Sequence, residues 1–280
     1  MPELPEVHTI IASLEKAGLP GSRIVSAWSE RPNTVGGDLE AFRERVSGRQ
    51  IAGLRRRGKY IILELLPERV VIIHLRMSGR LFLADTPNEA YVRAALQLDS
   101  DQWLCLYDPR RFARMECHDD LDDLFGRLGL EPLDDGFSEN LLAIAIGVGT
   151  NSPTPIKARL LDQRRIAGIG NIYADEALFD SGIHPSFPAS KLNPDQVQKL
   201  HAAIRTVLQR GINNLGTSLG HGKTNFSLPD GSRGGNQEDV RVFQRTGLPC
   251  VRCGRPIQRI VVAQRGTHFC PDCQPLLESE

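Results

Sequence analysis

The sequence predicts an α+β multidomain protein with three parts. These are an N-terminal antiparallel β-sandwich preceded by a helix, a helical middle, and a small C-terminal β-hairpin module. Seven short apolar runs bounded by turn residues lie between residues 23 and 107. Helical periodicity replaces them over residues 141–220, and two CxxC pairs lie near the end. At 280 residues the chain exceeds the usual size of one domain.

The first expected element is an amphipathic helix. Its apolar residues Val7, Ile10, Ile11 and Leu14 recur at helical spacing after Pro5, before a stop at Gly18. The expected strands follow at 23–29, 50–54, 60–66, 70–75, 80–83, 92–98 and 103–107, with a short helix at 38–46. Short strands at hairpin-like spacing, without regularly alternating helices, indicate an antiparallel sandwich or barrel.

The middle of the chain has the apolar spacing of helices. Four are expected, over residues 139–147, 154–163, 171–182 and 194–211. Residues 216–236 are rich in Gly, Ser, Asn and Pro and are expected to form a long loop. A loop of this length in a compact protein is usually functional or disordered.

Charge gives a weak indication of the partner. Lys plus Arg equals Asp plus Glu at 34 each, which argues against binding of nucleic acid by bulk charge. However, residues 49–59 carry five basic and no acidic residues, and residues 240–271 carry six arginines and no acid. Clustered basic residues are expected at phosphate-binding surfaces, so these two zones slightly favour DNA or RNA over ordinary solvated surface.

The composition is that of a globular protein, with 40% hydrophobic and 24% charged residues. No apolar run is long enough to cross a bilayer, and the start lacks the basic and apolar stretches of a secretory signal. We therefore expect a cytoplasmic protein that is not secreted and has no membrane partner.

The most specific motif is the double CxxC of Cys250, Cys253, Cys270 and Cys273, whose pairs are 16 residues apart. This spacing fits one tetrahedral zinc ion, and disulfides are disfavoured in a cytosolic chain. Four sulfurs leave no open coordination position, so the zinc is expected to be structural, which disfavours a zinc-catalysed reaction. The hairpin-like stretch between the pairs presents its arginines either to phosphates or to solvent.

The stretch GIGNIYADEALF, residues 168–179, is a weaker motif. Glycines before a helix let the backbone approach an anion, which the free amides and the helix dipole attract. Taken alone, the stretch is better explained by a tight turn between helices in which Asn171 caps the second one.

The N-terminal stretch MPELPEV offers a reagent that side chains do not supply. Once Met1 is removed, Pro2 is a secondary amine with a pKa of about 8, so that part of it is neutral near pH 7. Its attack on an aldehyde-like carbon gives a permanently cationic iminium, which draws electrons from groups β to that carbon. Glu3 is placed to act as a general acid, and Glu6 to orient the site.

Together, PELPEV, RRRGKYIILEL, HLRMSGRL, YDPRRF, GIGNIYADEALF and the double CxxC resemble the formamidopyrimidine-DNA glycosylase family. The motifs occur in this order from residue 2 to residue 273. The resemblance implies a catalytic β-sandwich over 1–130, a helix-two-turns-helix DNA-binding domain with a loop that covers the lesion over 131–238, and a zinc finger over 239–274.

The resemblance also implies a bifunctional DNA glycosylase and abasic-site lyase of base excision repair. Such an enzyme excises oxidised purines, namely 8-oxoguanine and formamidopyrimidines, through an N-terminal proline Schiff base and cleaves the strand by β,δ-elimination. The expected partner is duplex DNA with oxidised bases or abasic sites, bound by a monomer. The expected cofactor is one structural Zn²⁺.

Roles of individual residues follow from the same resemblance. Pro2 matches the nucleophile at C1′, Glu3 the acid that opens the sugar, and Glu6 a supporting carboxylate. Lys59 matches a lysine that serves β-elimination, and Arg265 an arginine of phosphate binding and δ-elimination. The implied DNA contacts are Met77, Tyr91, Arg110, Phe112, Lys157 and Asn171. Three of them, Met77, Arg110 and Phe112, match residues that fill the space left by an extruded base.

Two alternatives remain from the sequence. Leu4 matches the oxidised-purine branch, whereas an endonuclease VIII-like enzyme for oxidised pyrimidines typically carries glycine there. A non-catalytic zinc-finger protein that binds damaged DNA is the other alternative, and the intact Pro2–Glu3 pair argues against it. The chain also departs from the family pattern at His8, at Tyr91, and in the loop 216–236, where aromatic residues are common.

Overall fold

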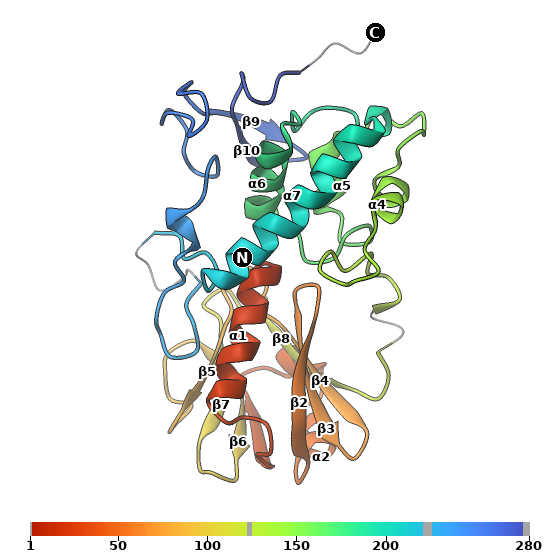
Figure 1. Cartoon of the computed structure of the whole chain (residues 1–280). Helices are drawn as coiled ribbons and strands as arrows, with labels where there is room; N and C mark the ends of the chain where they lie inside the picture. Colours follow the sequence, from red (N-terminus) through yellow and green to blue (C-terminus); the bar gives the residue numbers. More distant parts are fainter. Residues whose placement is uncertain (1, 122–124, 221–225, 277–280) are drawn as a thin grey trace. The chain divides into compact units, whose positions relative to one another are not determined.

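The computed structural model describes residues 2–121, 125–220 and 226–276, which form two compact units (Figure 1). Unit 1 comprises the chain up to residue 126 together with 211–237, and unit 2 comprises 127–210 and 238–280. The loop that follows the last long helix thus groups with the N-terminal part of the chain. The three-domain division into 1–130, 131–238 and 239–274 stays a prediction. Within the described part, no helix is both long and apolar enough to span a membrane.

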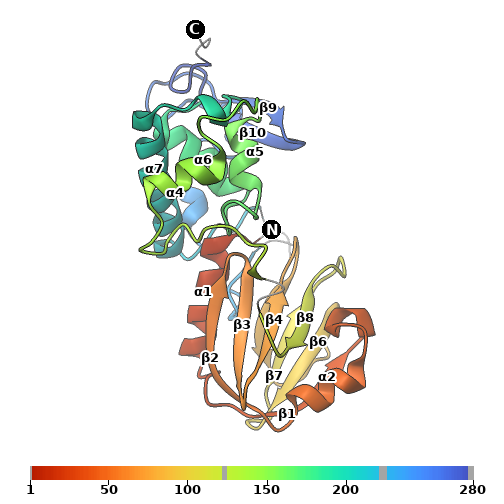
Figure 2. The same ribbon diagram turned by 90° about the vertical axis from the view of Figure 1, so that its right-hand side faces the viewer.

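Unit 1 contains two four-stranded antiparallel sheets (Figure 2). The first has the order β1-β6-β7-β5 and the second the order β2-β3-β4-β8. The strands of the first sheet are β1 (Ile24–Ser29), β6 (Val92–Leu98), β7 (Trp103–Tyr107) and β5 (Arg80–Ala84). Those of the second are β2 (Gln50–Arg57), β3 (Tyr60–Leu66), β4 (Arg69–His74) and β8 (Arg114–His118).

The core of unit 1 joins both sheets to helix α1 (Leu4–Lys16). Val7, Ile10 and Leu14 of α1 are buried with apolar side chains of both sheets, as the helical spacing predicts. Helix α2 (Leu39–Val46) is capped by the side chain of Asp38, the residue before it. The helix adds Phe42 and Val46 to this core. A short 3₁₀ helix, η1 (Pro32–Val35), precedes α2.

The helices α4 (Glu139–Ile146), α5 (Ile156–Leu161), α6 (Asn171–Ser181) and α7 (Pro194–Asn213) follow in the chain. The short 3₁₀ helices are η2 (Ala189–Lys191) and η3 (Asn236–Glu238), and the hairpin strands are β9 (Gln258–Val262) and β10 (Arg265–Phe269). Helix α6 is buried around most of its circumference, so it forms the centre of unit 2.

The C-terminal module is anchored to α6. Phe179 of α6 packs with Val242, Cys250 and Ile257. The buried carboxylate of Glu176 accepts three backbone N–H bonds of 2.8–3.0 Å from residues 241–243. A small module without a large core of its own is thereby fixed to a helix.

The predicted fold class is confirmed, with an antiparallel sandwich, a helical middle and a C-terminal hairpin module. Strand β8 (Arg114–His118) was not predicted. It directly follows the polar YDPRRF stretch, and its own residues are mostly polar, so the sequence there resembles a loop. Strand β2 continues to Arg57 through three consecutive arginines, which are tolerated because β2 is at the edge of its sheet.

Candidate active site and metal centre

The N-terminal residues predicted to carry the chemistry stand at the start of α1. Glu3 is its N-cap residue, and its backbone N–H donates to Oε2 of Glu6 at 2.8 Å. This is a capping-box arrangement, in which a carboxylate at the third helical position satisfies an N–H that the helix leaves unpaired. Glu3 is 3% and Glu6 1% exposed, and Pro2 is also buried. The residue next to Pro2 is therefore held by a buried hydrogen bond.

Lys59 occupies the turn between β2 and β3. Arg57 and Tyr60 are paired, so Gly58 and Lys59 form a two-residue hairpin loop, and Gly58 has φ of +54°. A glycine with positive φ at the first loop position is typical of tight hairpin turns. The Lys59 side chain is 6% exposed, so the turn holds a buried ammonium group instead of presenting it freely to solvent.

His74, which the sequence analysis missed, lies near Lys59. It pairs with Tyr60 across β3 and β4, and the two rings meet edge to face at 4.5 Å. Its Nδ1 accepts the N–H of Arg76 at 3.0 Å. Desolvation, with smaller contributions from the charges of Arg76 and Lys59, lowers the pKa of His74 to about 3. The one feature of the sequence that could have indicated this buried histidine is its position at the end of an apolar strand.

Met77, Arg110 and Phe112 form one exposed cluster in unit 1. An N–H of the Arg110 guanidinium points at Sδ of Met77 at 3.3 Å, and its Cζ lies 5.2 Å from the centre of the Phe112 ring. Met77 is 47% and Phe112 50% exposed. Large apolar side chains held by stacking at the surface are suited to insertion into another molecule. The structure thus brings together the three residues that the sequence grouped.

Asp108 organises the turn beneath that cluster and was also missed. Its fully buried carboxylate accepts from the hydroxyl of Ser78 at 2.5 Å. It also accepts the N–H groups of Arg110 at 3.0 Å, Phe112 at 2.7 Å and Ala113 at 2.8 Å. One carboxylate thus joins the turn that carries Met77 to the turn that carries the other two members.

Tyr91 is exposed and strained. Its φ is +74°, which is unfavourable for an aromatic residue, and its ring meets that of Tyr107 at 5.9 Å. The guanidinium of Arg93 lies 5.4 Å from its ring centre. Backbone strain of this kind costs free energy and is concentrated at functional sites. The conformation presents the phenol to solvent, where it can donate one hydrogen bond.

In unit 2, Asn171 and Arg265 are brought together. Asn171 begins α6, and its Nδ2 donates to the carbonyl of Gly266 at 3.0 Å. Arg265 starts β10 after a two-residue turn in which Ala263 and Gln264 both have positive φ. Arg265 is exposed. Asn171 therefore contacts the residue that follows Arg265, 95 positions further along the chain. An amide and a guanidinium are both groups that bind phosphate.

Lys157, which is predicted to contact DNA, lies in the interior of unit 2. Its side chain is fully buried, and Nζ lies 2.6 Å from Oδ1 of Asp175 and 2.7 Å from Oγ1 of Thr267. The carbonyl of Gly266 is 3.3 Å from the same Nζ. An ammonium group enclosed by these partners does not reach a phosphate in this conformation. Its observed role is to connect α5, α6 and β10.

Several arginines of the second basic zone are also used inside the protein. Arg241 and Arg252 both pair with Asp180, at 2.7 and 3.2 Å. The guanidinium of Arg259 lies against Gly266, where an added Cβ would approach it to 2.8 Å. The zone is therefore less available for phosphates than the count of six arginines suggested, although Arg265 is exposed.

The four zinc-finger cysteines converge. Their sulfur atoms all lie within 4.8 Å of one another, with Cys250 and Cys273 at 3.9 Å and Cys253 and Cys270 at 3.4 Å. Zn–S bonds of about 2.3 Å in a tetrahedron imply S···S distances of about 3.8 Å. The N–H of Arg252 donates to Sγ of Cys250, as is typical of ligands tuned by their surroundings. The geometry fits one structural zinc ion.

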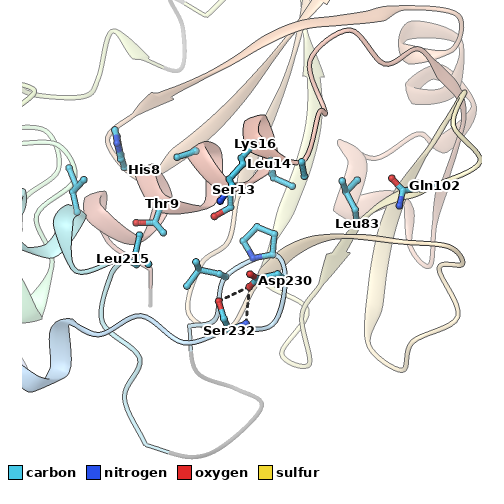
Figure 3. Close-up of a pocket in the computed structure, with 15 residues that line it drawn as sticks. His8, Thr9, Ser13, Leu14, Lys16, Leu83, Gln102, Leu215, Asp230 and Ser232 are labelled. Carbon is cyan, nitrogen blue, oxygen red and sulfur yellow. Dashed lines mark hydrogen bonds between the residues drawn. The ribbon is translucent and has the colours of Figure 1, made fainter.

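His8 lines a cavity of about 780 Å³ in unit 1 (Figure 3). The cavity lies between the face of α1 that carries Ser13 and Lys16 and the segment that carries Asp230 and Ser232. Burial, followed by the charge of Arg56, lowers the pKa of His8. His8 thus belongs to the wall of this cavity, whereas Glu6 on the same helix is engaged in the buried bonds of the N-cap.

Comparison with known proteins gives matches along almost the whole chain. The family model described as the formamidopyrimidine-DNA glycosylase N-terminal domain matches residues 1–115. The model of the H2TH domain of the same enzymes matches residues 128–221, and a zinc finger found in FPG and IleRS matches residues 247–276.

Individual relatives are similar over their full length. The formamidopyrimidine-DNA glycosylase of Protochlamydia amoebophila is 42% identical, over 98% of this chain and 99% of that protein. The MutM (FPG) crystal structure from Thermus thermophilus is 38% identical with a TM-score of 0.86, over 98% of each chain. A Lactococcus lactis Fpg complex with abasic-site DNA is 36% identical with a TM-score of 0.88, over 98% of this chain and 99% of that chain. The chain therefore belongs to the formamidopyrimidine-DNA glycosylase family.

Proposed function

We propose that the protein is a bifunctional DNA glycosylase and abasic-site lyase of base excision repair. It excises oxidised purines, namely 8-oxoguanine and formamidopyrimidines, from duplex DNA and then cleaves the strand by β,δ-elimination. The observation that carries this proposal is the position of Pro2 directly before Glu3, whose backbone is held by buried Glu6 at the start of α1. Proline at the terminus supplies the secondary amine that Schiff-base chemistry requires.

The first step is displacement of the base. After removal of Met1, the lone pair of the Pro2 nitrogen forms a bond to C1′, and the C1′–base bond breaks with its electron pair leaving on the base. The Pro2 nitrogen gives up its N–H proton after the attack, and the departing base takes up one proton. Glu3 gives a proton to the sugar O4′ while the ring opens, and the C1′–N bond becomes an iminium. Glu3 is 3% exposed, so its carboxyl group is shielded from bulk water.

The iminium then drives the two eliminations. Loss of the C2′ proton breaks the bond from C3′ to its phosphate, and loss of the C4′ proton breaks the bond from C5′ to the other phosphate. Lys59 serves the first elimination, while Arg265 and Asn171 hold phosphate groups and Arg265 favours the second. Water hydrolyses the iminium and restores Pro2. Cationic side chains placed at leaving phosphates stabilise the charge that develops there.

The exposed cluster of Met77, Arg110 and Phe112 supports base extrusion. Apolar wedges between base steps stabilise an unstacked duplex while a polar side chain contacts the orphaned partner base. Among the similar solved structures are complexes of Lactococcus lactis FPG with Fapy-dG-containing DNA and with abasic-site DNA. These observations support duplex DNA as the partner. We further propose that the protein acts as a monomer in the cytoplasm.

The proposal is tested by borohydride trapping on an oxidised-guanine duplex, using protein whose intact mass shows that Met1 is absent. Wild-type protein should give a covalent adduct that maps to Pro2, and protein without an adduct would contradict the iminium mechanism. A duplex with an oxidised pyrimidine, processed in parallel, distinguishes the endonuclease VIII-like alternative.

The acid role of Glu3 has a matched control. Glu3→Gln should abolish excision of the intact damaged base while duplex binding remains. Glu15→Gln makes the same chemical change at an exposed position of the same helix and should leave excision unchanged. Full excision by Glu3→Gln would refute the assigned role, and wild-type protein that binds the damaged duplex without excising the base would point to a damaged-DNA binder.

A further inference from the structure

Arg93 in strand β6 is a buried arginine that joins three segments of unit 1. Its side-chain Nε donates to the backbone carbonyl of Asp108 at 2.7 Å, and its Nη1 pairs with Oε2 of Glu30. Cζ lies 5.4 Å from the centre of the Tyr91 ring. Arg93 is 6% exposed, and a buried guanidinium needs such partners for its charge and its N–H groups. It therefore links Tyr91, the end of β1 and the turn of residues 108–112, which we call the wedge turn.

Glu30 follows directly after strand β1 and connects two arginines. Its Oε2 pairs with Arg93, and its Oε1 accepts a bond from Nη2 of Arg111 at 2.9 Å. The backbone N–H of Glu30 also donates to the carbonyl of Arg93 at 2.9 Å. Arg111 belongs to the wedge turn. Arg93 thus reaches this turn directly, through Asp108, and a second time through the carboxylate of Glu30.

The two segments that Arg93 joins contain strained backbone. Tyr91 has φ of +74° and Arg111 has φ of +62°, a region that residues other than glycine rarely adopt. Strained conformations persist where the surrounding contacts fix them. The N–H of Asp108 donates to the carbonyl of Tyr91 at 2.9 Å, and the N–H of Arg111 donates to the carbonyl of Asp108 at 3.3 Å. The side chains of Arg93 and Glu30 add their contacts to these backbone bonds.

Tyr91 and the wedge turn present different groups to solvent. Tyr91 is 52% exposed, and its phenol is suited to a phosphate. The wedge turn carries Arg110 and Phe112, which belong to the cluster that supports base extrusion. Phosphate contacts fix the register of a protein on a duplex, and binding groups act together only when they are held within about 0.5 Å of the required geometry. The distance between Tyr91 and the wedge turn therefore decides whether both can engage one duplex.

We propose that Arg93 and Glu30 are positioning residues that hold Tyr91 and the wedge turn at the spacing at which one duplex contacts both. The inference rests on the proposed function, because it takes both segments to bind DNA. Arg93 is buried and Glu30 carries a negative charge, so neither is expected to attract phosphates itself. Loss of either side chain should nevertheless weaken duplex binding, because Tyr91 and the wedge turn would no longer be held together.

Glu30→Gln separates positioning from net charge. Removal of a negative charge by itself should strengthen binding of a polyanion. Glutamine has one acceptor oxygen, so it accepts from one arginine and turns its NH₂ group toward the other. We expect Glu30→Gln to raise the Kd of a duplex that contains an uncleavable tetrahydrofuran analogue of an abasic site by about 3- to 10-fold.

Glu40→Gln is the matched control. It makes the same chemical change in an ion pair of α2, where Glu40 lies 2.6 Å from the guanidinium of Arg43. None of the proposed DNA contacts lies on α2, so this variant should not raise the Kd. Unchanged or tighter binding by Glu30→Gln would overturn the inference.

A double-mutant cycle tests whether Arg93 acts through Tyr91. Tyr91→Phe should raise the Kd of the same duplex by about fivefold in the wild type, but by less than about twofold in the Arg93→Met background, where the ring is no longer held. Equal losses in the two backgrounds would overturn the inference, because a merely structural arginine would leave the effect of the phenol unchanged. Should Arg93→Met fold poorly by its melting temperature, Glu30→Gln provides the background instead, because the Glu30 side chain is 31% exposed. Wild-type protein that binds neither this duplex nor an oxidised-guanine duplex would instead contradict the proposed function.

Discussion

The ammonium of Lys157 lies 2.6 Å from the carboxylate of Asp175, and neither side chain has any exposed surface. The other oxygen of Asp175 accepts the N–H of His268 at 2.9 Å. The pair therefore links α5 and α6 to strand β10, which begins with Arg265. A lysine that the sequence predicts to contact DNA is therefore buried in unit 2, next to the strand that begins with Arg265.

Removal of one partner of this pair should be strongly destabilising. Lys157→Met leaves a buried carboxylate without its counter-charge, and we expect the free energy of unfolding to fall by about 3–5 kcal/mol. The double variant combines Lys157→Met with Asp175→Asn, whose neutral amide can still accept the His268 N–H. The free energy of unfolding should therefore fall less in the double variant than in Lys157→Met. Urea unfolding of the wild type, both single variants and the double variant measures this. A Lys157→Met protein of wild-type stability that binds duplex weakly would instead restore a direct DNA contact.

The buried carboxylate of Asp108 should be needed for the shape of the exposed cluster. Asp108→Asn replaces one acceptor oxygen by an NH₂ group that faces N–H donors, which should cost about 1–3 kcal/mol of stability. It should also weaken binding of a lesion-containing duplex, because the turns that carry Met77 and Phe112 lose their common partner. Thermal unfolding and duplex titration report the two effects.

Phe112→Ala is the matched variant for that prediction. Its ring is 50% exposed, so stability should stay within about 0.5 kcal/mol of the wild type while excision falls. Stability loss in Phe112→Ala equal to that of Asp108→Asn would mean that the cluster is part of the core and not a surface for DNA.

Local patterns in the sequence predicted most of the fold. The period of α1, the strand runs and the CxxC spacing each follow from residues close together in the chain. What the sequence could not provide were links between distant residues. The bond from Glu6 to Thr217 spans 211 positions, and the contact of Asn171 with Gly266 spans 95. Burial of Lys157 was missed for the same reason, since its partners lie on other elements and a lysine is ordinarily expected at the surface.

The zinc site should hold one metal ion per chain and require all four of its cysteines. Cys253→Ser should lose the zinc and weaken duplex binding, because the hairpin that carries Arg265 is closed by the metal. Cys105→Ala is the control. Burial raises the pKa of Cys105 to about 12, so it stays a thiol that does not bind metal, and its substitution should leave the zinc content at one. Elemental analysis of the purified variants decides this, and zinc retained by Cys253→Ser would contradict the assigned ligand set.

Acid should destabilise unit 1 through His74. Burial lowers the pKa of His74 to about 3, against about 6.5 in an unfolded chain. Between these values the unfolded state binds a proton that the folded state does not, so the free energy of unfolding falls as the pH falls below about 6.5. At pH 5 the loss relative to neutral pH should be about 2 kcal/mol from this residue.

His74→Asn isolates that contribution. The asparagine oxygen can accept the N–H of Arg76 in place of Nδ1, but it does not titrate. The difference in unfolding free energy between pH 7 and pH 5 should therefore be smaller in the variant than in the wild type, even if the variant is less stable at both. Some pH dependence will remain, because burial also lowers the pKa values of His8 and His184. An identical pH dependence in the two proteins, measured by urea unfolding, would show that folding does not lower the pKa of His74.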